Sequence, residues 1–431
     1  MTSSRTKTQE FLDVSRTYEP DCMNWQAPVV WDHASGAEIW DVDGKHYIDW
    51  TSGVLVANVG HAHPLLAKAL AGQAARLLNT FDFPTPERLL LAETVVKAAP
   101  AHLDKVIFLT TGSEAMDAAM RLAKRFTGKF EIVSFWGSFH GRTFGPMSLS
   151  GIPKIRRNYG PLVPGTILAP YPYCYRCPFD KTHPQCDLFC LSFLDQLVGV
   201  ESSGSLAAVI VEPYQGTAGF VFPPPGWLKK LEAWAKGQGL LFILDEVQSS
   251  FGRTGKMWAL EHEGLEPDIL VLGKGIGSGA PIAALVTRSS IISCLERGEM
   301  SSTLGGNPLS SAGALAVFEI IEKEGLVDKA ARTGAYLKGK LLALKDKHEW
   351  IGDVRGMGLV YGIEFVLDRG TKAPAPDLAK DVVLRCVERG LMVGKLGLHG
   401  NVMRVAPPLV ITPDLIDRSV AILDGVLSGL R

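Results

Sequence analysis

The chain has 431 residues, of which 46% are hydrophobic and 21% charged, and its formal net charge is -1. This length predicts two or three domains with a large apolar core, and the balanced charge argues against nucleic acid or an anionic membrane as a partner. The polar start has no apolar signal segment, and no apolar run approaches the roughly 18 residues of a membrane span. We therefore expect a cytoplasmic protein.

The N-terminal segment, residues 1–65, is expected to form an arm and a hairpin. The residues to about Tyr18 are polar, and we expect them to become ordered only on a partner surface. Residues 37–49 read as two strands joined by a turn at Asp43 and Gly44. Because this hairpin must pack somewhere, we expect it to share a small domain with the C-terminal residues 311–431.

The middle of the chain, residues 66–310, is expected to be a large α/β domain. Short apolar strands alternate with helical patterns there, and the candidate strands are residues 106–110, 132–135, 207–211, 240–244 and 269–272. These strands are apolar on both faces, which is typical of a mainly parallel sheet covered by helices. Beyond residue 310, long helical patterns flank strands around 358–365 and 402–405, which predicts a smaller α+β domain.

The first chemical signal is a turn between a buried strand and a helix. Gly112 lets the backbone approach a ligand closely, and Ser113 can cap the helix and donate a hydroxyl. Free N–H groups and the helix dipole at this position favour an anion such as a phosphate. The alternative is an ordinary strand, turn and helix with a serine cap.

Two further signals lie at the ends of later strands. Asp245 ends a very apolar strand, where ligands of α/β sheets bind, and a buried carboxylate there needs a cation. A protonated pyridine nitrogen is such a cation, whereas a helix cap or a metal ligand is the alternative. Lys274 follows another buried strand and enters a glycine-rich loop, which suits an imine-forming amine. A surface lysine beside a flexible turn is its alternative.

A phosphate cradle, a carboxylate and a lysine together are the contacts that pyridoxal 5'-phosphate (PLP) requires. At this point the sequence resembles the class-III PLP-dependent aminotransferases of fold type I, which include ornithine and 4-aminobutyrate aminotransferases and dialkylglycine decarboxylase. The resemblance runs from about residue 24 to the C-terminus. It is carried by residues 244–255 and by the motifs Thr51-Ser-Gly, Gly60-His-Ala-His-Pro, Phe139-His-Gly-Arg-Thr, Val211-Glu-Pro, Gly273-Lys-Gly, Gly305-Gly-Asn-Pro and Arg404-Val-Ala-Pro-Pro.

The resemblance implies an enzyme in which Lys274 carries the cofactor as a Schiff base and later shuttles a proton. It implies that Asp245 keeps the pyridine nitrogen protonated, so that the ring withdraws electrons. Thr303 matches a threonine that reaches the phosphate from a partner subunit, so a homodimer with shared active sites is implied. The other cofactor-binding positions that it implies are Gly112, Ser113, Phe139, His140, Glu212, Val247 and Gln248.

The resemblance also bears on the substrate. Arg404 matches an arginine that binds a substrate carboxylate through a bidentate fork. Thr217 stands where relatives that use ω-amino donors often have a glutamate that pairs with this arginine, so we expect Arg404 to be permanently available. Val54 stands where dialkylglycine decarboxylase places a glutamine, which favours amino transfer over decarboxylation.

The reaction that we expect is transfer of an amino group from an amino acid or amine to a 2-oxo acid, either pyruvate or 2-oxoglutarate. Racemases and aminomutases use the same scaffold and lysine, so they remain an alternative class, as does a decarboxylating transaminase. A PLP-binding regulator without catalysis is a more distant alternative.

Four of the seven cysteines crowd into one short stretch with the spacing C-x2-C and then C-x3-C: Cys174, Cys177, Cys186 and Cys190. This spacing suits a structural zinc or an iron–sulfur cluster. The alternatives are four reduced thiols that pack a loop, or a local disulfide. The odd count and the absence of a signal segment argue against a disulfide scaffold.

Overall fold

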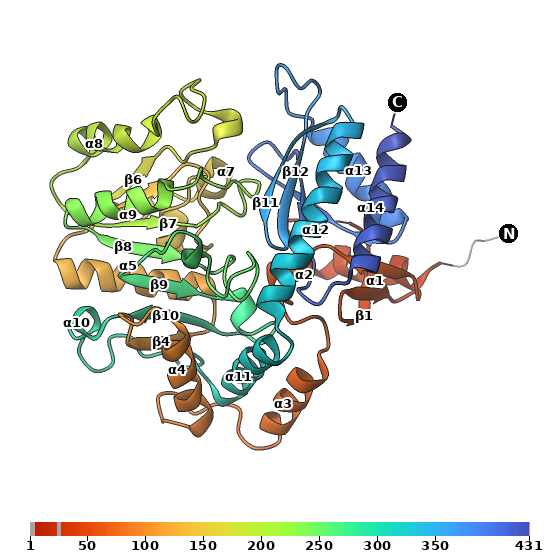
Figure 1. Cartoon of the computed structure of the whole chain (residues 1–431). Helices are drawn as coiled ribbons and strands as arrows, with labels where there is room; N and C mark the ends of the chain where they lie inside the picture. The colour runs from red at the N-terminus through yellow and green to blue at the C-terminus, as the bar shows by residue number, and fades with distance from the viewer. Residues whose placement is uncertain (1–4, 24–26, 431) are drawn as a thin grey trace.

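The computed structural model describes residues 5–23 and 27–430. The first four residues of the expected arm, and residue 24, where the resemblance begins, lie outside the described residues. Figure 1 shows a larger lobe around the middle of the chain and a smaller lobe that contains both chain ends. Within the described ranges, no helix is long and apolar enough to cross a membrane.

The larger lobe is built on a seven-stranded sheet, with strand order β4-β10-β9-β8-β7-β5-β6. Only β10 runs antiparallel to its neighbours, which confirms the predicted α/β class. The five predicted strands are present as β4, β5, β7, β8 and β9, whereas β6 and β10 were not predicted. The bounds are β4 Lys105–Leu109, β5 Glu131–Phe135, β6 Thr166–Ala169, β7 Leu206–Val211, β8 Leu241–Asp245, β9 Ile269–Leu272 and β10 Ala283–Thr287.

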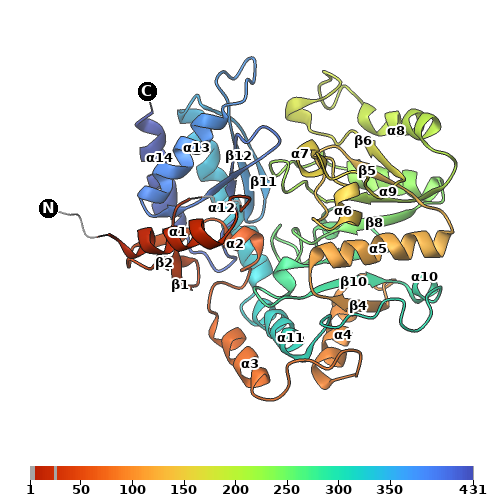
Figure 2. The same cartoon turned by 180° about the vertical axis from the view of Figure 1, so that it is seen from behind.

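Helices cover both faces of this sheet (Figures 1 and 2). On one face α5 buries an alanine-rich stripe against Ile210, Ile243 and Val271, and on the other α9 packs Trp227 and Leu231 against the alternate strand residues. The sheet is therefore buried on both sides, as its continuous apolar strands predict. The helices of this lobe are α4 Pro86–Ala98, α5 Gly112–Thr127, α6 Phe144–Ser148, α7 Pro153–Arg156, α8 Phe189–Glu201, α9 Trp227–Gly237 and α10 Ser289–Ile292.

The smaller lobe holds two four-stranded sheets, β1-β2-β3-β13 and β11-β12-β15-β14. Antiparallel pairing of β2 with β3 confirms the predicted hairpin, and β3 pairs in parallel with β13 from the other end of the chain. The strands are β1 Trp31–Ser35, β2 Glu38–Asp41, β3 His46–Asp49, β11 Ile351–Met357, β12 Val360–Phe365, β13 Leu391–Met392, β14 Gly394–Leu396 and β15 Val402–Val405.

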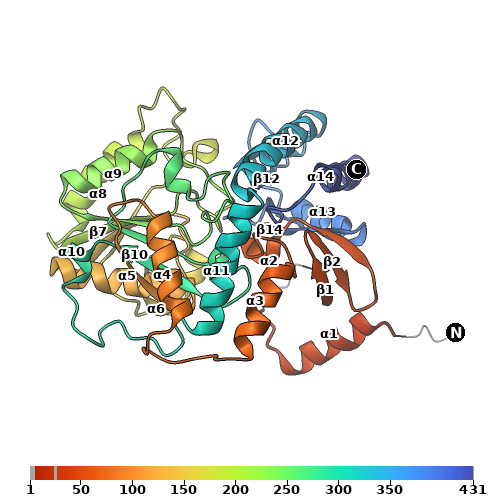
Figure 3. The ribbon, with the colours of Figure 1, turned by 60° about the horizontal axis from the view of Figure 1, so that its bottom comes forward.

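Long helices pack on and between these parts. In Figure 3, α11 runs between the two lobes beside α3, and α12, α13 and α14 cover the C-terminal strands. The expected domain boundary at residue 310 falls in the first turn of α11, and both expected boundaries stay a prediction. The remaining helices are α1 Lys7–Tyr18, α2 Ser52–Leu55, α3 Pro64–Ala74, α11 Pro308–Lys323, α12 Leu326–Lys347, α13 Pro376–Glu388 and α14 Pro413–Ser428.

The N-terminal segment forms the helix α1, an element that the sequence did not predict. A capping box between Thr6 and Gln9 satisfies the first N–H groups, and the carboxylate of Asp43 accepts from the N–H groups of Lys7 and Thr8. None of the side chains of α1 is buried. Local capping and contact with the hairpin turn therefore define this helix, and its expected ordering on a partner surface stays a prediction.

Candidate active site

A cleft of about 200 Å³ opens at the carboxyl ends of the central strands. It brings together nine of the ten predicted cofactor residues and Thr217, and its walls are Thr111, Gly112, Ser113, Phe139, His140, Gly141, Glu212, Thr217, Asp245, Val247, Gln248 and Lys274. Thr303 does not line this cleft and is exposed in its own chain. Its contact from a partner subunit stays a prediction.

One end of the cleft is the start of α5. Thr111 caps the helix by accepting from the N–H group of Glu114, whose side chain in turn accepts from the N–H groups of Thr110 and Thr111. Gly112 and Ser113 are the first two helical residues, so their N–H groups have no acceptor within the helix. The start of α5 therefore offers free N–H groups and a positive dipole end to an anion.

Close packing explains why residue 112 is a glycine. A side chain there would bring its Cβ within 2.9 Å of Val247 Cγ1, which is closer than real Cβ contacts allow. Because Val247 follows Asp245 on the next loop, the missing side chain lets α5 and this loop meet at the floor of the cleft.

Asp245 ends β8 and is joined to a buried hydrogen-bond chain. One carboxylate oxygen, Oδ2, lies 2.7 Å from His140 Nδ1, and the other accepts from the N–H group of Val247 at 3.0 Å. His140 Nε2 lies 3.4 Å from the hydroxyl of Ser134. Burial disfavours the charged ring of His140, but the hydrogen bond and charge of Asp245 outweigh burial and raise its pKa. The hydrogen bond with His140 therefore holds the Asp245 carboxylate in place at the end of β8.

Glu212 holds two loops that border the cleft. Its carboxylate accepts from the N–H group of Phe139 at 2.9 Å and from that of Gly216 at 3.1 Å. Burial raises the pKa of Glu212 to about 7, the nearby His140 lowers it and the charge of Asp245 raises it further. Glu212 therefore acts on the cleft by positioning Phe139 and the 216–219 loop.

Lys274 lies just after β9 and lines the cleft. Its backbone has a positive φ of 44°. Burial lowers the pKa of Lys274, although the charges of Asp245 and Glu212 oppose this shift. Its amine is thus more easily deprotonated than that of a surface lysine. A strained, non-glycine backbone at a cleft is typical of functional positions.

Gln248 provides the clearest test of whether a cofactor fits. Its side-chain oxygen Oε1 is buried and has no hydrogen-bond partner among the described residues, which is costly unless a ligand supplies a donor. The amide packs so closely on Gly216 that a Cβ at that glycine would lie 2.0 Å from Oε1. With the free N–H groups of α5, the Asp245 carboxylate and the Lys274 amine, the unpaired amide fits PLP.

Arg404 lies in β15 beside this cleft. It is 4% exposed, its Nε atom has no hydrogen-bond partner, and its charge reaches Lys274, whose pKa it lowers further. Burial lowers the pKa of Arg404 itself to about 10, an effect that the charge of Asp49 opposes. Across the described residues no carboxylate forms an ion pair with Arg404, so its guanidinium can accept a carboxylate from a ligand.

Asp49 was not predicted as a site residue, yet this fully buried carboxylate supports the site. It accepts from the N–H group and hydroxyl of Thr51 at 2.6 and 2.7 Å, and from the N–H group of Ser52 at 3.0 Å, and it lies 2.8 Å from His61 Nε2. It holds the turn that carries Val54. The Thr51-Ser-Gly motif was the available signal, but only the structure links it to Asp49.

The cysteine segment does not support the predicted metal site. Over residues 5–23 and 27–430, no group of three or more His, Cys, Asp or Glu side chains is arranged to hold a metal ion, although all four cysteines and His183 border one small cavity. The cysteines are free thiols, and burial raises the pKa of Cys190 to about 11. Phe179, Phe189 and Phe193 pack against each other in this segment. The alternative of reduced thiols that pack a loop stays a prediction.

Comparisons with known proteins agree with this geometry. The family model described as "Aminotransferase class-III" matches residues 22–427. A solved amine transaminase from an uncultivated Pseudomonas species, in its PLP-bound form, is 30% identical with a TM-score of 0.88, and the match covers 93% of this chain and 94% of that one.

Two curated relatives differ in the reaction that their names give. The acetylornithine aminotransferase of Methanothermobacter thermautotrophicus is 36% identical over 98% of this chain and 100% of its own length. The leucine/methionine racemase of Thermococcus litoralis is 40% identical over 94% of this chain and 92% of its own length.

Proposed function

The chain belongs to the class-III aminotransferase family, whose members depend on PLP, and we propose that it transfers the amino group of an α-amino acid to a 2-oxo acid such as pyruvate or 2-oxoglutarate. One observation carries the proposal: an anion cradle, an acid and an amine of lowered pKa line a single cleft beside an unpaired arginine. When bound, PLP supplies an aldehyde that condenses with amines and a ring that withdraws electrons from the substrate α-carbon.

In this proposal the residues of the cleft divide the work between them. Lys274 is the amine that would hold the cofactor and, once released from it, would take up the proton from the substrate α-carbon. Asp245, held in place by His140, stabilises positive charge on the cofactor ring nitrogen. Gly112 and Ser113 bind the phosphate through the start of α5, and Phe139, Val247 and Gln248 orient the ring.

Arg404 binds the substrate carboxylate next to the amine. Its buried guanidinium has no ion-pair partner among the described residues, and Thr217 cannot compete for it as a glutamate would. This supports donors that carry a carboxylate beside the amine. Val54, which cannot donate a hydrogen bond, favours loss of the α-proton over loss of the carboxylate.

We also propose a homodimer in which Thr303 reaches the partner's cofactor phosphate. Exposed apolar side chains around α3 and α4 support an interface on this side of the molecule; they include Leu78, Phe83, Leu89 and Leu90. Sedimentation of the holoenzyme at several concentrations tests the dimer. Thr303→Ala should then weaken PLP retention.

Lys274→Ala tests the central assignment. The variant should lose turnover, because no other amine of the cleft can hold the cofactor and move the α-proton. Lys97→Ala, which removes an exposed lysine of α4, is the matched control and should keep full activity. Retained turnover in Lys274→Ala would contradict the proposal.

Racemisation is a second candidate, favoured by the 40% identity with a racemase. A racemase removes the α-proton and returns one to the opposite face, so it needs no 2-oxo acid. Incubating one enantiomer without an acceptor and separating the products by chiral chromatography distinguishes the two. Formation of the other enantiomer without a keto acid supports racemisation, whereas stoichiometric conversion of a second 2-oxo acid supports amino transfer.

A further inference from the structure

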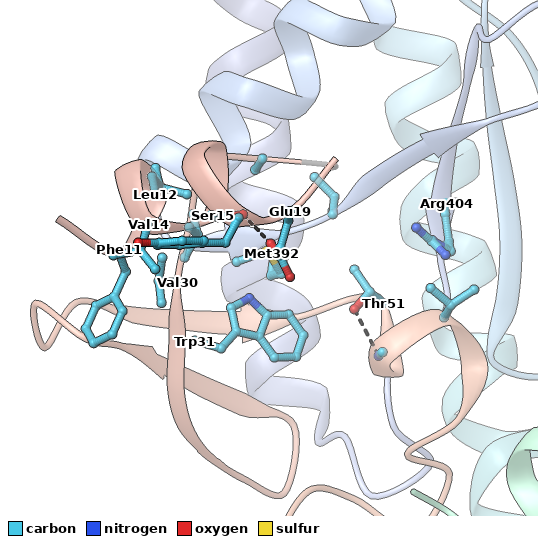
Figure 4. Close-up of a pocket in the computed structure, with 16 residues that line it drawn as sticks. Phe11, Leu12, Val14, Ser15, Glu19, Val30, Trp31, Thr51, Met392 and Arg404 are labelled. Carbon is cyan, nitrogen blue, oxygen red and sulfur yellow. Dashed lines mark hydrogen bonds between the residues drawn. The ribbon is translucent and has the colours of Figure 1, made fainter. Parts of the chain in front are cut away.

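A second cavity, of about 620 Å³, is lined by Arg404, and we call it the apolar chamber. Figure 4 shows Arg404 at one end of it, Trp31 across its middle and α1 over the opposite end. This volume lies in the usual range for small-molecule sites, roughly 300–1,000 Å³. The residues that line the chamber include Ser15, Glu19, Trp31, Val54, Met392 and Arg404.

The walls of the apolar chamber suit a hydrocarbon group. Among the described residues that line it, Arg404 is the one cation, and Glu19 is the one carboxylate and accepts a hydrogen bond from the Ser15 hydroxyl. Most of the other side chains that line the chamber are aliphatic or aromatic. A charged substrate side chain would lose water here and gain little in return, because the carboxylate of Glu19 is exposed to solvent and already accepts from Ser15. An apolar side chain would gain from burial.

Arg404 fixes how a substrate lies between the two cavities. It lines the apolar chamber, and its charge also acts on Lys274 in the cleft. The turn that carries Val54 leads directly to Asn58, whose Nδ2 would lie 2.7 Å from a Cβ at Gly275, the residue after Lys274. An α-amino acid that binds Arg404 through its carboxylate and presents its amine to Lys274 has one large substituent left at the α-carbon. The chamber at Arg404 is the space available to that substituent.

The near wall of the chamber is held in a strained conformation. Ser52, Gly53, Val54 and Leu55 have φ values of 49°, 56°, 69° and 61°, a left-handed turn that is unfavourable for side-chain-bearing residues. Asp49 holds this turn through three hydrogen bonds from Thr51 and Ser52. The turn keeps Val54, which is 47% exposed, at the edge of the chamber. Strain of this kind is typical of sites that position a ligand.

We propose that the apolar chamber receives the substrate side chain, that the substrates are α-amino acids with bulky apolar side chains, and that Val54 and Trp31 set the fit. The inference rests on the proposed function, because it needs chemistry at the α-carbon beside Lys274. It adds the side-chain class, which neither the cleft nor Arg404 determines.

The first test measures exchange of the α-hydrogen in D2O by NMR, because amino transfer and racemisation both produce it. The holoenzyme is given leucine, methionine and phenylalanine, and then alanine, aspartate and lysine. We expect the rate constant of exchange divided by KM to be about 100-fold larger for leucine, methionine and phenylalanine than for aspartate or lysine. Exchange with charged side chains at equal rate overturns the inference and leaves the proposed function standing, whereas no exchange with any amino acid contradicts both.

The second test is Val54→Asn. Asparagine tolerates positive φ better than valine does, so the fold and the absorbance spectrum of the bound cofactor should be unchanged. The ratio of kcat/KM for leucine to that for alanine should fall about tenfold, because an amide in an apolar wall must lose water to admit a bulky side chain. Released carbon dioxide is measured as well, because the amide can donate a hydrogen bond to the substrate carboxylate that Val54 cannot. Val200→Asn, on an 84% exposed residue of α8, is the matched control and should change neither value. An equal fall for leucine and alanine, or no fall, overturns the assignment of Val54.

Discussion

The cofactor cleft and the apolar chamber are linked through Arg404, which lines the chamber and whose charge acts on Lys274, but the two cavities are built in opposite ways. The cleft gathers polar groups at the ends of parallel strands, and its charged residues hold one another through hydrogen bonds such as that between Asp245 and His140. The chamber gathers apolar side chains from α1, the segment before β1, a strained turn and β13, with few charges. Arg404 therefore acts on Lys274 in the cleft through its charge, and it also forms part of the wall of the chamber.

This difference separates two properties of the enzyme. The cleft supplies the reaction, which depends on fixed charges and on an amine of lowered pKa. The chamber supplies selectivity, which depends on volume and on the absence of charge partners. Changes in the cleft should therefore affect all substrates alike, whereas changes in the chamber should affect substrates according to their side chains.

Asp245→Asn should give the largest loss, about 10³-fold in kcat/KM for every amino donor. The amide keeps the shape of Asp245 but removes the charge that stabilises the cofactor ring. Removal of this charge should also lower the pKa of His140, measured by NMR, because Asp245 raises it. Asp346→Asn, on an exposed residue of α12, is the control. Activity within about threefold of wild type would contradict the division of roles.

Arg404→Lys tests whether Arg404 binds the substrate carboxylate. Lysine keeps a positive charge but loses the planar fork, so kcat/KM for α-amino acids should fall about 100-fold. An amine without a carboxylate should be affected far less. Arg297→Lys, on an exposed arginine, should leave both donors unchanged. If amino acids and simple amines fall equally, Arg404 supports the structure and does not bind the substrate carboxylate.

Thr217→Glu should shift preference without stopping the reaction. A carboxylate at this position is expected to pair with Arg404 and to move the ratio of ω-amine to α-amino acid kcat/KM by about tenfold. Thr217→Ser keeps the hydroxyl and serves as the control. An unchanged ratio in Thr217→Glu would remove the argument that Arg404 is permanently available.

The two cavities also differ in how far the sequence predicts them. Gly112, Asp245 and Lys274 follow apolar strands directly, and parallel strands bring their carboxyl ends to one edge of a sheet, so these residues could be placed together before the structure was known. The chamber is assembled from segments that are distant in the chain and have no chemical motif. Only the fold brings them together.

Local rules fail at specific places for physical reasons. The turn at Val54 adopts a left-handed conformation against the preference of its residues, and Asp49 holds it through contacts that no local pattern indicates. The helix α1 was not predicted because its polar residues show no clear apolar face, and the capping box of Thr6 and Gln9 alone is a weak signal. The cysteine spacing predicted a metal, but spacing does not determine where side chains point.

The smallest effect concerns pH and separates the cavities without any substrate. In the apoenzyme, burial lowers the pKa of Lys274 below its ordinary value of 10.5, so unfolding takes up a proton between the lowered pKa and 10.5. Stability contributed by this site therefore rises as pH increases through that interval. Lys274→Met removes the titration, so the variant should be more stable than wild type near pH 7, and the difference in Tm should narrow by a few degrees, about 2–4 °C, as pH approaches 10. Val54→Asn, in the chamber, removes no ionisable group, so its Tm difference from wild type should be independent of pH. A parallel pH dependence in both variants would mean that the titration does not belong to the cleft.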